Sequence, residues 1–378
     1  MGPKAAALAT IPLQDTGRLY AEYANDLKAA AIGVMKSGWW LNGVHNAAFA
    51  REFADFIDAS ACIPVANGTD ALEIALRALI HARQIAGDEV VTVANAGGYA
   101  STAIRHIRMT PVYVDIDIQT QLVNTESLLS ALGPQTAVVV LTHLYGGVID
   151  VSSIRNRMDE AGYRHVPILE DCAQAHGAAV KGRRVGSIGD IGTFSFYPTK
   201  NLGAMGDGGA IVTSDTTIGE AVRRLHQYGW SEKYQVALSG GRNSRMDEIQ
   251  AAILSVLLPR LDVMNNRRCE ILAAYSDSST SATVPVQPAH TVAHLAVFLV
   301  ENRDSFRKHC LDHGILTDVH YPILDCDQPG WTTLPKRIAP LGLRQSRESV
   351  EKIVTLPCFP SMTDHEVARI CSVLRSYK

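Results

Sequence analysis

The sequence predicts an α/β protein: a large domain with a mostly parallel seven-stranded sheet flanked by helices, followed by a smaller C-terminal α/β domain. Three observations predict this class. From about Pro64 to Thr213, short β-rich runs alternate with helical patterns. Most of these runs are apolar along their whole length, which is typical of parallel strands covered on both faces. After Ser214, longer helical stretches replace the alternation and indicate a second unit.

Seven runs are predicted to be strands because they are short, apolar or β-branched, and bounded by turn residues. They are Cys62–Ala66, Glu89–Val93, Pro111–Val114, Ala137–Thr142, Val166–Glu170, Thr193–Phe196 and Ala210–Thr213. Helical patterns separate the first five, at Ala71–Arg83, Ser101–Ile107, Glu126–Leu132 and Val151–Ala161. No helical pattern separates the last two, which favours an antiparallel strand there.

The later part of the chain is predicted to form the smaller domain. Two helices are predicted after Ser214, at Ile218–Gln227 and from Arg245 to about Tyr275. The remainder, with a strand at Val292–Val300 and helices at Asp304–His313 and Asp364–Arg375, is predicted to be the smaller domain. Pro259 is expected to break or kink the helix that begins at Arg245, because proline lacks an N–H and clashes with the preceding turn. We place the boundary within residues 240–265 and divide the chain into residues 1–250 and 251–378.

Composition excludes several kinds of partner. The formal net charge is −3 over 378 residues, so the chain has no strong basic field for nucleic acid. Apolar runs such as Ala137 to Leu141 are far too short to span a bilayer. We therefore predict neither nucleic acid nor membrane as a partner.

The N-terminal segment and the cysteines give two further expectations. The segment before Asn67 carries Trp39, Trp40 and Leu41, so it is predicted to pack against the smaller domain or a partner chain. It begins without the long apolar run of a secretory signal.

Seven scattered cysteines without a C-x-x-C pair favour a reducing cytoplasm and argue against disulfides and structural zinc. We predict a cytoplasmic protein with no metal site.

Two polar motifs follow predicted strands, and ligands of open parallel sheets bind outside the carboxyl ends of strands. Asn67-Gly68-Thr69-Asp70 begins a helix, where free N–H groups and a glycine suit a phosphate, although Thr and Asp are also ordinary caps. Glu170-Asp171 ends the fifth strand. A carboxylate there would keep a protonated pyridine nitrogen charged. A metal ligand or a helix cap would have the same sequence.

Lys200 lies between the strand Thr193–Phe196 and a glycine-rich run. An amine on such a constrained turn can reach a buried aldehyde, and burial near other cations lowers its pKa as a covalent lysine requires. Most of the residues around it in the sequence are apolar, aromatic or glycine, which argues against an exposed loop lysine. The phosphate-loop pattern G-x-x-x-x-G-K-[ST] is not present around it.

Four segments together resemble the DegT-type nucleotide-sugar group of fold-type I aminotransferases, which depend on pyridoxal 5′-phosphate (PLP). They are NGTDALEIALRAL at 67–79, EDCAQAHGA at 170–178, FSFYPTKNLGAMGDGGAIVT at 194–213 and NSRMDEIQAAIL at 243–254. The resemblance extends from about Tyr20 to the C-terminal helix. It implies that the large domain binds PLP, with pyridoxamine 5′-phosphate as the cofactor's intermediate form.

The resemblance implies roles at the cofactor ring. Lys200 would be the Schiff-base lysine and then the base that moves the α-proton of the substrate. Asp171 would pair with the pyridine nitrogen, and Gln174 would hydrogen-bond the ring hydroxyl. Tyr99 falls where the family stacks an aromatic ring on the cofactor, although the preceding residues 95–98 differ from the commoner family wording.

The resemblance also implies how the phosphate is held. Gly68, Thr69 and Ser195 would bind it within one chain. Asn243 matches an asparagine that reaches the phosphate from the neighbouring subunit, which implies a homodimer with shared active sites.

On the substrate side, the resemblance suggests Tyr197, Lys233, His320 and Tyr321. A nucleotide diphosphate is anionic, so Lys233 is physically sensible there. Ordinary packing would account for His320 and Tyr321 equally well.

The activity implied is a ping-pong transfer of an amino group from glutamate or glutamine to a nucleotide-linked keto-sugar. The segments HLYG at 143–146, SFYPTKNLG at 195–203 and QYG at 227–229 resemble family members that act on 3-keto-6-deoxyhexoses more than members that act at the 4-position. This resemblance favours a dTDP-3-keto-6-deoxyhexose as the acceptor. A 4-keto-sugar nucleotide or a keto-cyclitol is the alternative acceptor. Lys200 argues against dehydratase relatives, which have histidine at that position. A non-catalytic PLP-binding regulator is disfavoured because Asp171 and the phosphate residues are present as well.

Overall fold

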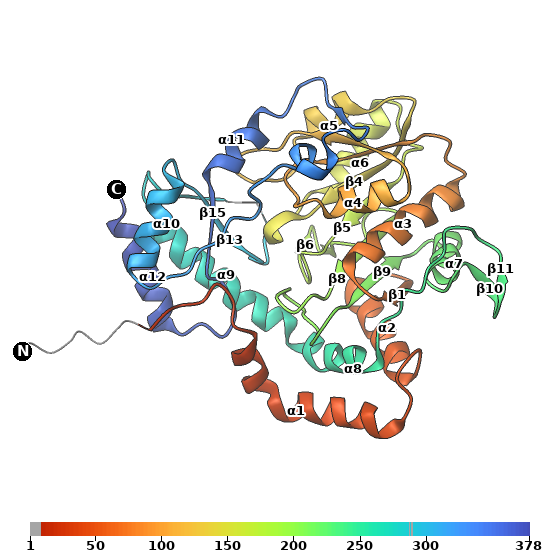
Figure 1. Ribbon diagram of the computed structural model, residues 1–378, viewed down its shortest axis with the longest axis horizontal. Coiled ribbons are helices and arrows are strands. Elements are labelled where there is room, and N and C mark those ends of the chain that lie inside the picture. The colour runs from red at the N-terminus through yellow and green to blue at the C-terminus, as the bar shows by residue number, and fades with distance from the viewer. Residues whose placement is uncertain (1–8, 287, 289) are drawn as a thin grey trace, which may run out of the picture.

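The computed structural model describes residues 9–286, 288 and 290–378, and its centre is an eight-stranded sheet (Figure 1). The strands lie in the order β1 (Ala61–Val65), β9 (Gly209–Thr213), β8 (Ile191–Ser195), β5 (Ile168–Asp171), β4 (Thr136–Thr142), β2 (Glu89–Val93), β3 (Thr110–Val114) and β14 (Arg337–Ile338). β8, β5, β4, β2, β3 and β14 are parallel neighbours, whereas β9 is antiparallel to both β8 and β1.

The predicted α/β class is confirmed, and all seven predicted strands belong to this sheet. The antiparallel strand that we expected among the last two is β9. The additional strand β14 contains only two residues, too few for any periodic signal.

Helices cover both faces of the sheet because its strands are apolar on both faces. All seven residues of β4 are buried. Val138 and Val140 pack with one cluster of core residues, whereas Val139 and Leu141 pack with another. The helices that follow the first strands are α3 (Gly68–Arg83), α4 (Tyr99–His106), α5 (Thr125–Ala131), α6 (Val151–Glu160) and α7 (Thr216–Leu225). Side chains at Asn67, Asn124, Asp150 and Asp215 cap four of them.

A second, three-stranded sheet forms the C-terminal part of the structure. It consists of β12 (Val284–Pro285), β13 (Ala296–Leu299) and β15 (Ile353–Leu356), all antiparallel, with α9 (Leu261–Ser278), α10 (Arg303–Asp312), α11 (Arg344–Lys352) and α12 (Asp364–Ser376) around it. The break expected at Pro259 is confirmed: α8 (Glu248–Leu257) passes into α9 through a 3₁₀ turn at Leu258–Arg260. The division after residue 250 stays a prediction and falls within α8.

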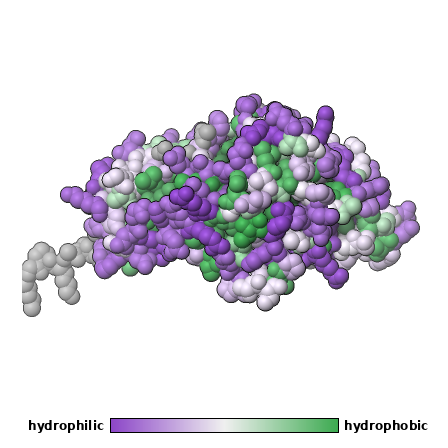
Figure 2. Space-filling view, turned by 90° about the horizontal axis from the view of Figure 1, so that it is seen from above, coloured by the Kyte–Doolittle hydropathy of each residue, from purple (hydrophilic) through white to green (hydrophobic). Residues whose placement is uncertain are grey.

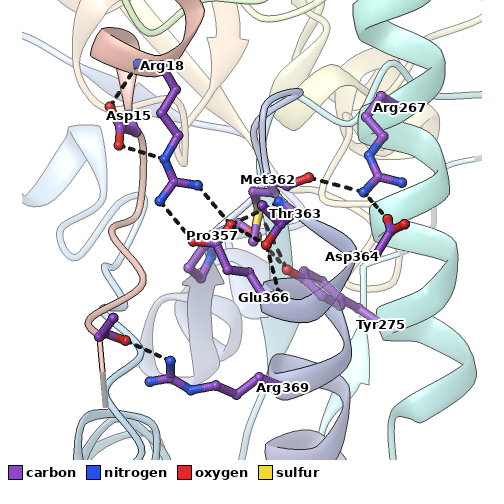
Figure 3. A network of polar contacts seen from close by, with 11 residues as sticks. Asp15, Arg18, Arg267, Tyr275, Pro357, Met362, Thr363, Asp364, Glu366 and Arg369 are labelled. Atoms are coloured by element: carbon purple, nitrogen blue, oxygen red, sulfur yellow. Dashed lines mark hydrogen bonds and ion pairs between the residues drawn. The ribbon is translucent and has the colours of Figure 1, made fainter. Parts of the chain in front are cut away.

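The N-terminal segment forms α1 (Thr16–Ser37) and α2 (Val44–Ile57), which the sequence did not predict. Arg18 makes two hydrogen bonds of 2.8 Å to the carboxylate of Glu366 in α12 (Figure 3). Asp15 accepts the Arg18 N–H at 3.1 Å and caps α1. The expected packing against the smaller unit is therefore confirmed for the start of this segment, while α2 packs on α8 and β1.

Short elements complete the fold. They are two hairpins, β6–β7 (Ala179–Val180 and Arg183–Arg184) and β10–β11 (Trp230–Glu232 and Gln235–Val236), and single 3₁₀ turns at Leu144–Gly146, Asp325–Asp327 and Pro329–Trp331. Seen from above, green apolar patches reach the otherwise polar surface (Figure 2). Among the described residues, none of the helices combines the length and the apolar character that crossing a bilayer requires.

Candidate active site

A cavity of about 660 Å³ lies at the carboxyl ends of β1, β2, β4, β5 and β8. This is the edge of the sheet at which α/β proteins bind ligands. Ten of the predicted site residues line it: Gly68, Thr69, Tyr99, Asp171, Gln174, Ser195, Tyr197, Lys200, His320 and Tyr321. The two predicted residues that do not line it are Asn243 and Lys233. The cavity has the size of a small-ligand site.

Lys200 and Asp171 lie in this same cavity. The backbone N–H of Lys200 donates to Tyr197 at 2.8 Å, which closes the turn after β8 and directs the lysine inward. Burial lowers the pKa of the Lys200 amine to about 8, although the nearby Asp171 opposes this shift. A substantial share of the amine is therefore neutral, and hence nucleophilic, near pH 8.

Asp171 is buried at the end of β5 but has few hydrogen bonds. Its carboxylate accepts the Ala173 N–H at 3.2 Å and faces the Thr142 hydroxyl at 3.5 Å. Burial raises its pKa, although Ala173 and Lys200 lower it in part. A desolvated carboxylate with spare lone pairs suits a cationic N–H partner, which is what a protonated pyridine ring provides.

The adjacent Glu170 differs from Asp171, because its hydrogen bonds are already made. Its carboxylate accepts backbone N–H groups from Gly186, Ile188 and Gly189 at 2.6–3.0 Å and faces His143 Nε2 at 3.1 Å. Burial alone would raise the pKa of Glu170, but His143 and the backbone donors outweigh it and lower the pKa. Glu170 therefore supports the fold around β5 and leaves Asp171 to meet a ligand.

Glu170 also forms a buried group with His143 and Cys172 whose ligand atoms lie within 4.8 Å of one another. His143 Nδ1 already accepts the Ile149 N–H at 3.1 Å. Because that nitrogen and the Glu170 carboxylate are both engaged, the group is a structural network rather than an open metal site.

The start of α3 forms one part of the cavity wall. Asn67, and not Thr69 or Asp70, caps this helix by accepting the Asp70 N–H at 2.8 Å. Thr69 therefore need not serve as the cap. A Cβ on Gly68 would lie 2.6 Å from the Ser195 Cβ, so only glycine allows the helix to start against β8. Backbone N–H groups at a helix start beside the Ser195 hydroxyl suit a phosphate.

Tyr99 begins α4 and meets Tyr321 edge to face, with the ring centroids 6.0 Å apart. Gly97 and Gly98 precede it with φ of 77° and 84°. A Cβ on Gly97 would lie 2.9 Å from the Tyr321 ring. The unusual residues before Tyr99 thus have a physical reason: the backbone passes directly against the segment that carries Tyr321.

Asp325 holds this junction together and was missed by sequence reasoning. Its buried carboxylate accepts the Gly98 N–H at 2.7 Å and the Ser101 hydroxyl at 2.8 Å. Burial raises the pKa of Asp325 to about 7, against the effect of these two donors. No local pattern could have indicated this contact, because Asp325 and Gly98 are 227 positions apart.

Gln174 links the cavity wall to the same segment. Its side-chain oxygen accepts the Tyr145 N–H at 2.7 Å, and its side-chain nitrogen donates to the Tyr321 hydroxyl at 2.9 Å. Tyr145 in turn donates its hydroxyl to the backbone oxygen of His320. The predicted contact of Gln174 with a cofactor hydroxyl stays a prediction.

Further cavity residues had no sequence signal. Leu13 and Gln14 reach the cavity from the N-terminal segment, and His294 and Leu295 reach it from just before β13. All four lie far in sequence from the motifs that predicted the site, so only the fold brings them there.

Comparison with known proteins places the chain among aminotransferases. The sequence model of the DegT/DnrJ/EryC1/StrS aminotransferase family matches residues 22–375. The dTDP-3-amino-3,6-dideoxy-alpha-D-galactopyranose transaminase of Aneurinibacillus thermoaerophilus is 38% identical over 97% of this chain and 99% of its own. The erythromycin biosynthesis sensory transduction protein EryC1 of Saccharopolyspora erythraea is 35% identical over 95% of this chain and 98% of its own.

Among solved structures, S. venezuelae DesV in complex with a ketimine intermediate superposes with a TM-score of 0.89 at 33% sequence identity. The match covers 97% of this chain and 98% of that one. These similarities confirm the resemblance that the four motif segments indicate.

Proposed function

The chain belongs to the DegT/DnrJ/EryC1/StrS aminotransferase family, and from this premise we propose that it transfers an amino group from glutamate or glutamine to a dTDP-3-keto-6-deoxyhexose. It is a PLP-dependent aminotransferase. The observation that carries the proposal is the presence of Lys200 and Asp171 in one cavity, with the helix start of α3 at its other end.

We assign different roles to the residues that line the cavity. Gly68, Thr69 and Ser195 would hold the phosphate, and Asp171 would accept a hydrogen bond from the pyridine nitrogen. When bound, PLP supplies an electron-withdrawing ring that stabilises negative charge at the amino-bearing carbon. Lys200 would take the proton from the amino-bearing carbon of the donor, and in the second half-reaction it would deliver a proton to the sugar carbon that receives the amino group.

The choice of carbon 3 is supported by the relatives. Several are named as transaminases or aminotransferases of 3-amino or 3-oxo sugars, linked to either dTDP or UDP. A 4-keto-sugar nucleotide or a keto-cyclitol remains the second candidate acceptor.

We further propose that the chain works as a cytoplasmic homodimer. Asn243 and Lys233 lie outside the cavity of their own chain. Trp39 and Trp40 are 66% and 63% exposed, which is unusual for large apolar side chains. A second copy that covers these tryptophans and brings Asn243 to the phosphate would account for both observations.

The test is a panel of amino-sugar nucleotides in the reverse half-reaction. Purified protein loaded with PLP is mixed with dTDP-3-amino or dTDP-4-amino sugars, and loss of the PLP absorbance is followed. We expect rapid conversion by a 3-amino sugar, none by the Lys200→Ala variant, and slower conversion by 4-amino sugars. Conversion only by 4-amino sugars would refute the carbon-3 assignment, and conversion by no amine would favour a PLP-binding regulator.

A further inference from the structure

His294 is a cavity residue to which no role has yet been given. It lies just before β13 and is only 4% exposed, and it lines the same cavity as Lys200. Its ring nitrogens have different surroundings, and the hydrogen bonds around it decide which nitrogen carries the proton.

A chain of amide side chains sets the tautomer of His294. The Asn265 side-chain nitrogen donates to the backbone oxygen of His176 at 2.8 Å, so its side-chain oxygen is free to accept. The Asn201 nitrogen donates to that oxygen at 2.7 Å and to the Val292 backbone oxygen at 3.0 Å. Only the Asn201 oxygen remains to face His294 Nδ1, at 2.8 Å. Because that oxygen can only accept, Nδ1 of His294 carries the proton.

Nε2 of His294 is therefore a lone-pair acceptor. It makes no hydrogen bond to any residue that the structure describes. Burial lowers the pKa of the His294 ring well below its ordinary value, and the cations at Lys200 and Arg268 lower it further. The ring stays neutral, so the lone pair is available throughout the pH range in which an enzyme of this kind works.

The surroundings also decide which kind of donor suits this lone pair. A ligand atom that only accepts hydrogen bonds would be repelled by it. A second ammonium would be disfavoured beside Lys200 and Arg268, because like charges repel in a desolvated site. A neutral hydroxyl meets both conditions.

We propose that His294 Nε2 accepts a hydrogen bond from a hydroxyl group of the sugar that enters the cavity at Lys200, and that His294 thereby contributes to the choice of sugar. This inference rests on the proposed function, because a sugar acceptor is what brings the hydroxyl. A site with a fixed acceptor discriminates strongly against an analogue that lacks the hydroxyl, since the buried lone pair is then left unpaired.

The tautomer is tested by ¹⁵N NMR of the protein labelled at histidine, before any ligand is added. The signals absent from the His294→Gln spectrum identify the ring. We expect a protonated Nδ1 and an unprotonated Nε2 from about pH 6 to pH 9. A protonated Nε2 in that range would overturn the inference.

The sugar contact is tested by measuring the two half-reactions separately. His294→Leu removes the acceptor, His294→Gln keeps an acceptor oxygen on a side chain of similar reach, and His313→Leu removes an exposed histidine at the end of α10 as a control. For His294→Leu we expect the KM of the amino-sugar to rise roughly tenfold to a hundredfold, with the glutamate half-reaction within about threefold of wild type. His294→Gln should recover most of this loss.

The proposal and its alternatives differ in which half-reaction is lost. If both half-reactions fall equally in His294→Leu, the ring supports Lys200 or the fold, and the sugar contact is refuted. If wild-type protein reacts with no amino-sugar, the proposed function falls and the sugar contact with it, whereas the NMR spectrum still decides the tautomer.

Discussion

The floor and the mouth of the cavity are built in different ways. The floor consists of Lys200 and Asp171, which lie at or just after the ends of neighbouring strands and line the cavity of their own chain. Tyr197, at the mouth of the cavity, is 53% exposed, whereas Lys233 lies in an exposed hairpin and does not line the cavity. The cavity of one chain therefore holds Lys200 and Asp171, whereas the proposed contacts of Asn243 and Lys233 would need a second copy.

The largest effect is expected at the floor. Lys200→Ala removes the only lysine that lines the cavity among the described residues. Transamination should fall by roughly a thousandfold or more, because both the covalent partner and the proton acceptor are lost. Steady-state rates measure this, with thermal unfolding as the control for folding. Activity within tenfold of wild type would contradict the catalytic role of Lys200.

The pair Glu170 and Asp171 separates stability from catalysis. Asp171→Asn should keep the unfolding midpoint and lower turnover roughly a hundredfold or more, because the ring loses its charge partner. Glu170→Gln should lower the free energy of unfolding by about 1–3 kcal/mol, since an amide nitrogen would face backbone N–H donors. Urea unfolding measures the stability of both variants, and steady-state transamination rates measure their turnover. Equal behaviour of the two variants would refute the contrast drawn between them.

The proposed contact between two copies is tested by the Trp39→Ser, Trp40→Ser double variant, which should remain folded but dissociate. Removing two exposed aromatic side chains from an interface should weaken dimerisation roughly tenfold to a hundredfold. Sedimentation over a range of protein concentrations measures this. If the wild-type protein is monomeric at every concentration, the proposed homodimer is refuted.

The junction between floor and mouth is expected to give the smallest effect. Gly97→Ala should lower the free energy of unfolding by about 1–3 kcal/mol and reduce activity, since a Cβ would press on the Tyr321 ring. Gly182→Ala is the matched control, because Gly182 has a φ of 78° but open space around it. In both variants an alanine must adopt a positive φ, so this cost is common to the two. The difference between their free energies of unfolding therefore measures the contact with Tyr321. No difference would mean that the ring moves aside freely.

The sequence predicted those features of the fold and the site that depend on neighbouring residues in the chain. The seven strands were predictable because strands buried on both faces of a sheet are largely apolar, whether they are parallel or, like β9, antiparallel. The positions of Lys200 and Asp171 were predictable because these residues end or follow such strands. α1 and α2 were not predicted. Asp325 and His294 could not be found either, because each gains its role from partners distant in the chain and no periodic pattern marks such a contact.

Borohydride trapping tests the central claim most directly. The PLP-loaded protein is reduced, digested and analysed by mass spectrometry, alongside Lys200→Ala and Asp171→Asn. We predict a single PLP-modified peptide containing Lys200 in the wild type and in Asp171→Asn, and none in Lys200→Ala. Modification of a different lysine, or of none, would contradict the assignment of this cavity as the catalytic centre.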